Sequence, residues 1–443
     1  MLKEEFTQQN VTKFNTPKTF VKRDGSKYPF AIFKLNMVLH NLDLDNVAPA
    51  VIEKIVAKLD AADEVNAQDV AVAFRDSLNE LGYFCFEELD ASIDVTKDVL
   101  VQEVFRPYST GEKTLDRNFL ATKSRIDLLK TMAESDRFAD LHVSYYVNDV
   151  DEEYERQFAA MVFSLPQLDY RQLVFRGTDD TLIGWKEDFK LSYVREIPAH
   201  RSSLKYLEEI LSENAGSFTL SGHSKGGNLA LYAATNVRPD LRSQITQIYM
   251  LDSPGLNEAD LAKEGYRAIR DKVRVIRPEE SIVGVMLYND IEPVIVQSQG
   301  VGIMQHALTN WQMDAETGQW LIAEHPTELS RNLEKTFKQW TDDLSSQELK
   351  LLFDTLFDTL MSSGITSIND LAVNREFMSK LSASLISFYS IGAEKKFLLA
   401  KSAKLFLGAF MGHSKLATLT KDRGNLSLPD LNRFRDYWDD RRE

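Results

Sequence analysis

The chain has 443 residues, 43% of them hydrophobic, which is enough for two or three domains with cores of their own. Its formal net charge of −15 argues against a nucleic acid partner, because phosphate neutralisation needs clustered Lys and Arg. The single cysteine, Cys85, excludes internal disulfides and a thiolate metal site. The N-terminus has no apolar signal-peptide core and no run of 18 uncharged apolar residues occurs, so we expect a soluble cytoplasmic protein.

Residues 1–106 are predicted to form a small α+β domain. Two short strands are joined at Asp24-Gly25, a hairpin signal, and run into a helix at about residues 34–42. Two further helical periods follow, the second ending at Leu81. The order of these elements indicates a unit that folds separately from the rest of the chain.

Three pieces of this unit resemble an ATP-cone, a small regulatory nucleotide-binding domain: VKRDG, the Pro29-Phe30 pair and LNELGY. The resemblance implies that ATP or dATP binds through its phosphates to cationic side chains, namely Lys22, Arg23 and Lys34. The segment that follows, FEELDASIDVTKD, departs from the family by adding acidic residues where polyphosphate would approach. The alternative is therefore a hairpin-and-helices module without nucleotide affinity.

A polar stretch at residues 107–117 is typical of a linker, and an α/β domain follows it to residue 335. Apolar strands there are separated by helical stretches such as residues 202–211, which predicts a mostly parallel sheet with helices on both faces. Within it, RQLVFRGTDDTLIGWKEDF at residues 171–189 combines a short strand, a polar turn and a helix. Such a turn can point backbone N–H groups outward.

Ser224 lies at the centre of a G-x-S-x-G pentapeptide, GHSKG, between an apolar strand and the small-residue helix NLALYAA. A nucleophile elbow requires this layout, because the turn is so sharp that the residues two before and two after the serine must be nearly free of side chains. In such enzymes, one amide after the nucleophile and one from an earlier loop hold the oxyanion. Those amides would belong to Lys225 and Thr178. The alternative is a glycine-rich turn without chemistry.

The two segments FRGT…W..DF and SGHSKGGNLA resemble class 3 lipases, and still more a bacterial family of hydrolases, the Mbeg-like proteins, over about residues 117–330. The resemblance implies a serine nucleophile followed by an acid and a histidine. His306, in GIMQHALTNW, is the candidate base, and the resemblance places its catalytic histidine there. His325 is typical of a surface turn.

The acid of the triad has more than one candidate. Asp252, in LDSPG, ends the strand that follows the elbow helix, where side chains face the ligand crevice of such sheets. Class 3 lipases instead carry their aspartate one strand later, in a D-x-V-P motif, and here RPEESIVG places Ser281 at that position. We favour Asp252, with Glu280 or Asp290 as alternatives, or no acid at all.

Residues 336–443 are predicted to be helical. ELKLLFDTLFDTLM has the spacing of an amphipathic helix, and the segment from Ser379 is both apolar and basic. A helix of the second kind can lie on an anionic membrane, although it more often packs on its own protein. The basic residues of that segment are Lys380, Lys395, Lys396, Lys401 and Lys404.

We therefore predict an α/β-hydrolase fold with an N-terminal ATP-cone-like domain and a helical C-terminal extension. The predicted activity is hydrolysis of a small-molecule or lipid acyl ester by Ser224, His306 and Asp252, with no metal or catalytic cofactor. Thioesters and amides use the same triad and remain alternatives. A second alternative is a catalytically inactive hydrolase-fold protein with a regulatory or scaffolding role, which the absent D-x-V-P aspartate keeps open.

Overall fold

The computed structural model describes the polypeptide in several segments. They are residues 19–21, 27–29, 65–66, 77–89, 93–109, 123–134, 139–166, 169–179, 181–312, 314, 319–362, 392, 395, 397–402 and 404–405.

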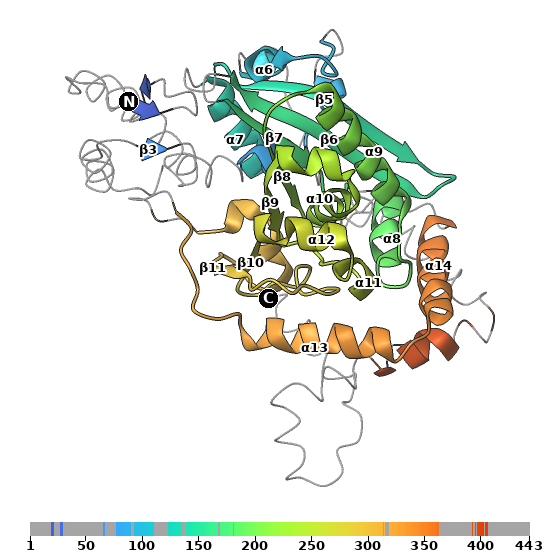
Figure 1. Cartoon of the computed structure of the whole chain (residues 1–443). Coiled ribbons are helices and arrows are strands. Elements are labelled where there is room, and N and C mark those ends of the chain that lie inside the picture. The colour runs from blue at the N-terminus through green and yellow to red at the C-terminus, as the bar shows by residue number, and fades with distance from the viewer. Residues whose placement is uncertain are drawn as a thin grey trace, which may run out of the picture.

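Near the N-terminus, three short strands form a sheet of their own (Figure 1): β1 (Thr19–Val21), β2 (Lys27–Pro29) and β3 (Val65–Asn66). β1 pairs antiparallel with β2 and parallel with β3. The first pairing confirms the predicted hairpin. The predicted phosphate-binding residues Lys22, Arg23 and Lys34 lie outside the described residues, so nucleotide binding stays a prediction.

Eight strands of the described residues form one mixed sheet at the centre of the molecule, in the order β11-β10-β9-β8-β7-β6-β5-β4 (Figure 1). Neighbours from β7 to β11 are parallel, whereas those from β4 to β7 are antiparallel. The strands are β4 (Val99–Leu100), β5 (His142–Asp151), β6 (Arg156–Leu165), β7 (Tyr170–Phe175), β8 (Phe218–His223), β9 (Ile245–Leu251), β10 (Val273–Pro278) and β11 (Val294–Val296).

The prediction of a mostly parallel sheet holds for the half that carries the elbow and is wrong for the other half. A parallel crossover needs about a dozen residues or more. Only a short turn joins β5 to β6, after Asp151, and β6 to β7, after Leu165, so these strands can pair only antiparallel. From β7 to β10, helices separate the strands and permit parallel pairing, and a loop of residues 279–293 does the same between β10 and β11.

One face of the sheet is covered by α9 (Pro198–Glu213), α10 (Lys225–Asn236) and α12 (Glu264–Ile269), which lie in front of it in Figure 1. Alternate residues of each strand point to this side, as the two-residue period of a strand requires. Leu173 and Phe175 belong to this cluster, whereas Val174 between them packs on the opposite side. α9 confirms the helix predicted at residues 202–211.

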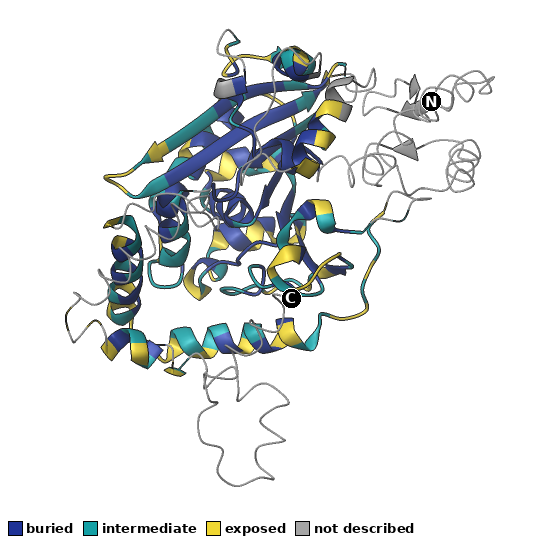
Figure 2. Ribbon diagram, turned by 180° about the vertical axis from the view of Figure 1, so that it is seen from behind, coloured by how far each residue is buried: buried dark blue, intermediate teal, exposed yellow. Residues whose placement is uncertain are grey.

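The opposite face is covered by the segment that precedes β5. Helical residues 77–81, α5 (Phe86–Leu89), α6 (Val101–Ser109) and α7 (Lys123–Glu134) pack there on apolar side chains of β5, β6 and β7. Phe86 and Phe105 are fully buried in this cluster, and in Figure 2 long stretches of the sheet strands have the dark blue colour of buried residues.

This packing differs from the boundary predicted at residue 106. That position falls inside α6, and β4 pairs with β5 as the last strand of the central sheet. The physical reason is burial: without residues 77–109, Met161, Phe163 and Val174 would lose the apolar side chains that cover them. The described residues 77–109 therefore share a core with the sheet.

Two long helices follow the sheet, α13 (Glu328–Asp342) and α14 (Ser346–Ser362), and α14 confirms the predicted amphipathic helix. α14 packs its apolar side against α8 (Leu182–Lys190), where Phe189 stacks near Phe353 with ring centroids 4.7 Å apart. The buried Lys186 of α8 lies 2.8 Å from Asp358 of α14. These contacts anchor α14 to α8, the helix that follows the Gly-Thr-Asp turn.

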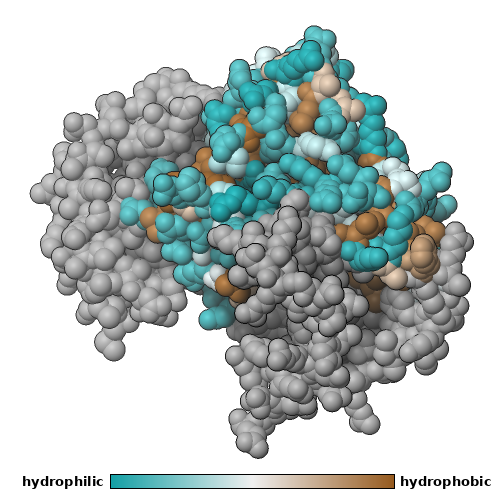
Figure 3. Space-filling model, turned by 90° about the horizontal axis from the view of Figure 1, so that it is seen from below, coloured by the Kyte–Doolittle hydropathy of each residue, from teal (hydrophilic) through white to brown (hydrophobic). Residues whose placement is uncertain are grey.

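The described piece of the basic C-terminal segment also packs on the protein. Leu398 is buried among α8 and α14 side chains, and Lys401 forms an ion pair with Glu348. Lys380 and Lys396 lie outside the described residues, so contact with a membrane surface stays a prediction. In the described part of the chain, no helix has both the length and the apolar character needed to cross a membrane. Figure 3 shows a mostly hydrophilic surface from below, with scattered hydrophobic side chains.

Candidate active site

Ser224 occupies a sharp turn between β8 and α10. Its backbone has φ 57° and ψ −134°, a conformation that non-glycine residues rarely adopt and that is strained for a serine. Ser224 itself is half-buried, whereas its neighbours His223 and Lys225 are buried. The turn is held on the sheet because the Ser224 amide donates to the carbonyl of Leu251 at the end of β9, at 3.0 Å. This is the geometry that the GHSKG pentapeptide predicts.

The glycines of the pentapeptide are required by close backbone contacts. A Cβ on Gly222 would lie 2.1 Å from the carbonyl carbon of Gly226, and one on Gly226 would lie 2.0 Å from the carbonyl oxygen of Phe175. Neither site can hold a side chain without moving the backbone. The tight turn and the close approach of α10 to β7 therefore both depend on glycine.

The Gly-Thr-Asp turn after β7 lies directly beside the serine. A Cβ on Gly177 would be 3.2 Å from the Cβ of Ser224 and 2.7 Å from the carbonyl oxygen of His223. Thr178 is fixed there because its hydroxyl donates to the carboxylate of Asp188. Burial raises the pKa of this carboxyl group to about 6. The structure thus brings together the two segments that sequence analysis predicts as oxyanion donors.

Lys225 begins α10 directly after the elbow serine and buries its side chain in the protein. As the first residue of α10, it has an N–H without an intrahelical acceptor. Its ammonium group points into the protein, 3.1 Å from Glu187 Oε2 and 2.6 Å from Gln157 Oε1. Glu187 also accepts from the amides of Gln157 and Ala199, so the buried ion pair is fully hydrogen-bonded.

His306 and Asp252 are hydrogen-bonded, with 2.6 Å between His306 Nδ1 and Asp252 Oδ2. Asp252 is fully buried, follows β9 directly and has φ 40°, another strained value for a residue with a side chain. His306 ends a 3-10 helix, Gly302–His306, and its ring lies 4.4 Å from that of His223. Among the hydrogen bonds of the described residues, there is none between Ser224 and His306.

In the described part of the chain, neither alternative acid forms a hydrogen bond or an ion pair with His306. The carboxylate of Glu280 accepts from the amide of Gly302, at 2.6 Å, and Asp290 is bound by Tyr266 and Arg270. Ser281, which stands where class 3 lipases carry their aspartate, donates to Asp252 Oδ1 at 2.5 Å. The serine at this position therefore supports an aspartate that comes from the preceding strand.

Sequence analysis missed a second histidine and a tyrosine at this site. His223 Nε2 lies 2.8 Å from the carbonyl oxygen of His306, and His223 Nδ1 lies 2.6 Å from the hydroxyl of Tyr83. Because a carbonyl only accepts, Nε2 carries the proton and Nδ1 accepts from Tyr83. Burial, together with the nearby charges of His306 and Arg125, lowers the pKa of His223 well below its usual value, so the ring is neutral.

Tyr83 is itself held from both sides. The guanidinium of Arg125 lies 3.8 Å above the centre of its ring, and Arg125 pairs with the buried Glu80 at 2.6 Å. Burial also raises the pKa of the Tyr83 phenol. A chain of contacts therefore runs from helical residues 77–81 through His223 to the backbone of His306.

Replacing Tyr83 by Phe is expected to lower kcat roughly 10-fold with little change in KM. The phenyl ring would still fill its place, but His223 would lose the donor that fixes its tautomer and would hold the His306 carbonyl less firmly, a loss of about 1–2 kcal/mol. Steady-state kinetics on an ester substrate over a pH series would measure the changes in kcat and in KM separately.

Tyr108→Phe is the matched control, because it removes another buried phenol, whose hydroxyl donates to the carbonyl of Leu89 at 2.9 Å. Tyr108→Phe should lower the melting temperature by about as much as Tyr83→Phe does, and it should leave kcat unchanged. An equal loss of kcat in both variants would reduce Tyr83 to a purely structural residue.

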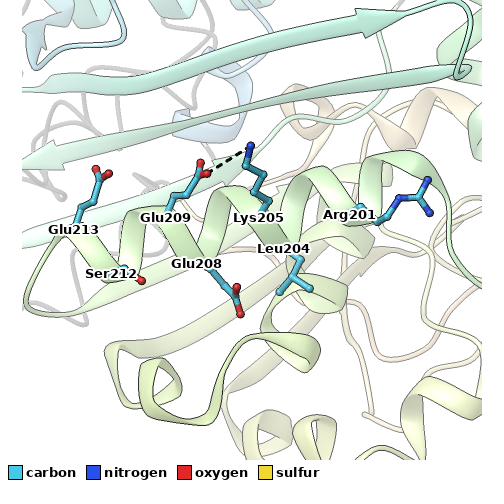
Figure 4. Close-up of a pocket in the computed structure, with 7 residues that line it drawn as sticks. All are labelled: Arg201, Leu204, Lys205, Glu208, Glu209, Ser212 and Glu213. Carbon is cyan, nitrogen blue, oxygen red and sulfur yellow. Dashed lines mark ion pairs between the residues drawn. The ribbon is translucent and has the colours of Figure 1, made fainter.

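A shallow depression elsewhere on the surface runs along α9 and is lined by side chains of that one helix, all of them polar or charged except Leu204 (Figure 4). Lys205 and Glu209 form an exposed ion pair there, at 3.6 Å. Such pairs contribute about 0–1 kcal/mol to stability. This depression contains none of the predicted site residues.

The Mbeg1-like family model matches residues 132–358, just over half of the 443 residues. The chain belongs to the Mbeg1-like family. This confirms the resemblance drawn from the two sequence motifs. The match spans β5 to β11, the elbow and His306, and it begins after Tyr83, so the contact of Tyr83 with His223 joins the family segment to the chain before it.

Two solved lipase structures are similar to this Mbeg1-like chain. A fungal lipase in complex with an inhibitor is 16% identical, with 52% of this chain and 78% of that chain covered and a TM-score of 0.32. M37 lipase is 14% identical, with 47% and 68% covered and a TM-score of 0.31. No curated protein matches the chain.

Proposed function

We propose that this protein is a serine hydrolase that cleaves a carboxylic ester, a small-molecule or lipid acyl ester, with Ser224 as the nucleophile. The observation that carries the proposal is the hydrogen bond of 2.6 Å between His306, at the end of a 3-10 helix, and the buried Asp252, directly after β9. Both residues lie beside the strained Ser224 turn. A histidine oriented by a carboxylate next to an elbow serine is the arrangement that activates a hydroxyl for acyl transfer.

His306 would act through Nε2, because its Nδ1 faces Asp252. In the first step Ser224 Oγ attacks the ester carbonyl and His306 takes its proton, while Asp252 stabilises the imidazolium. His306 then gives the proton to the leaving alcohol, which departs and leaves the acyl group on Ser224. Water, deprotonated by the same histidine, then hydrolyses this acyl-enzyme and frees the serine. Hydrogen bonds between serine and histidine are often long without substrate and shorten when it binds.

The oxyanion of the tetrahedral intermediate would be held by the amides of Thr178 and Lys225. Lys225 begins α10, so the positive end of the helix dipole adds to its amide. The Gly177 turn lies against Ser224, which supports the amide of the next residue, Thr178, as the second donor. Removal of one such donor usually costs about 10²–10³ in kcat.

The bond that is cleaved can be tested with matched substrates on the full chain. We expect p-nitrophenyl butyrate to be hydrolysed faster than the corresponding thioester and anilide. An ester oxygen accepts a hydrogen bond from the His306 imidazolium better than sulfur does, and the anilide nitrogen is a poorer leaving group than p-nitrophenolate. Faster hydrolysis of the thioester or the anilide would change the proposed substrate class but would leave Ser224 as the proposed nucleophile. A folded protein inactive on all three would favour the inactive regulatory or scaffolding alternative.

A further inference from the structure

The residue directly after the elbow serine is a lysine whose charge is buried. Lys225 is 1% exposed, and its ammonium group donates to the carbonyl of Gln157 at 3.0 Å and to Glu187 Oε2 at 3.1 Å. A buried ion pair is weak evidence for stability, because well-packed hydrophobic side chains of similar volume often stabilise a protein as much or more. The place of this charge beside the nucleophile therefore has to be explained in another way.

The same ammonium group also faces the carboxylate of Asp188 in α8. Lys225 Nζ lies 3.7 Å from Asp188 Oδ1, which is the only ion pair of Asp188 among the residues that the structure describes. The other carboxylate oxygen, Oδ2, accepts from the hydroxyl of Thr178. Asp188 thus connects the side chain of one proposed oxyanion donor to the side chain of the other.

The groups around Asp188 make its ionisation depend on the lysine. Burial and the nearby carboxylates of Glu187 and Asp179 raise the pKa of Asp188, Lys225 lowers it, and the result is a pKa of about 6. The phenol of Tyr83 also lies near and is neutral, because burial raises its pKa. A charged carboxylate holds the donated hydroxyl more strongly than a neutral carboxyl group does. Loss of the lysine charge would therefore raise the pKa of Asp188 further and weaken this hold.

We propose, on the basis of the proposed function, that the side chain of Lys225 is a positioning residue for the oxyanion hole. Its ammonium group keeps Asp188 charged and in place, and Asp188 holds the hydroxyl of Thr178. The amides of Thr178 and Lys225 are thereby kept at a fixed spacing. Lys225 then acts twice, because its amide is one donor and its side chain positions the other.

The kinetic test compares Lys225→Met, Asp188→Asn and the double variant, all in the full chain. Methionine fills the place of the lysine without its charge. We expect kcat for p-nitrophenyl butyrate to fall about 10- to 100-fold in each single variant with KM unchanged, which is less than the loss of about 10²–10³ when a donor is removed outright. Because both residues act on Thr178 through one contact, the double variant should lose no more than the larger single loss.

Lys263→Met is the matched control. Lys263 pairs with the buried Asp260 at 2.6 Å and lies at the far end of α10 from the elbow, so its variant should keep the wild-type kcat. If Lys225→Met does not fold, Lys225→Gln replaces it, since the amide is one bond shorter, can still donate to Glu187 and carries no charge. The proposal is overturned if the Lys225 or the Asp188 variant has the kcat of the control, or if the two losses multiply in the double variant.

A second measurement needs no turnover. Because the folded pKa of Asp188 is raised, its ionisation destabilises the folded protein increasingly as the pH rises toward that pKa and by a constant amount above it. The gain in melting temperature from Asp188→Asn should therefore level off above about pH 6 in the wild-type background and keep growing toward higher pH in Lys225→Met. The same pH dependence in both backgrounds would contradict the link between the two residues. A protein that shows this link and hydrolyses no ester would instead count against the proposed function.

Discussion

Ser224→Ala is expected to abolish covalent labelling by a fluorophosphonate probe and to reduce ester hydrolysis by several orders of magnitude. The substitution removes the only atom that would form the acyl-enzyme, and loss of the nucleophile in an enzyme of this kind typically costs about 10⁶ in kcat. Labelling followed by intact-protein mass spectrometry measures the first effect, and p-nitrophenyl butyrate hydrolysis the second.

Ser212→Ala is the matched control for this experiment, because Ser212 is an exposed serine of α9 outside the site. It should label and turn over like the wild type. If wild-type protein with a native circular dichroism spectrum does not label, or if Ser224→Ala still does, Ser224 is not the nucleophile.

Asp252→Asn should lower kcat about 10⁴-fold, whereas Glu280→Gln should leave it nearly unchanged. The amide keeps the shape of the carboxylate but can no longer stabilise the imidazolium or hold the required tautomer of His306. The Glu280 carboxylate accepts from the amide of Gly302, whereas the hydrogen bond of His306 Nδ1 goes to Asp252, so removal of the Glu280 charge should affect only the loop.

Kinetics of both variants, with melting temperatures measured in parallel, decide whether Asp252 or Glu280 is the acid of the triad. Asp252 is fully buried and also accepts from Ser281 and Gly284, so some loss of stability is expected in its variant. Activity must therefore be compared well below the lower of the two melting temperatures. A larger loss of kcat in Glu280→Gln would overturn the assignment of Asp252.

The local parts of the site could be predicted from the sequence because they depend on neighbouring residues. A strand, a glycine-flanked serine and a small-residue helix follow one another without a gap in residues 218–234, and the elbow follows from steric exclusion alone. Asp252 could be placed for a similar reason: the end of a parallel strand next to the elbow strand must lie at the same edge of the sheet.

The long-range parts could not be predicted in this way. Tyr83 and His223 are 140 positions apart, and nothing in LNELGY indicates that its tyrosine contacts the elbow. The role of Ser281 was equally hidden, since the sequence shows only that an expected aspartate is missing, whereas the structure shows that the serine hydroxyl binds Asp252.

The extent of the first domain differed from the prediction for a thermodynamic reason. Helical periodicity shows that residues 77–81 have an apolar side, but it does not show which surface buries it. The far face of β6 and β7 is apolar as well, and the two faces cover each other. Sequence patterns of this kind identify elements more reliably than they identify partners.

The contact between Tyr83 and His223 limits which segments of this chain can be removed or exchanged. A fragment cut at the start of the family segment, residue 132, would lose the phenol that holds His223 and the helices that cover one side of the sheet. The region ahead of the family segment therefore cannot be exchanged freely. A segment taken from a relative would have to bring its own partner for the histidine before the elbow serine. Any shortened version of the chain should begin upstream of residue 77.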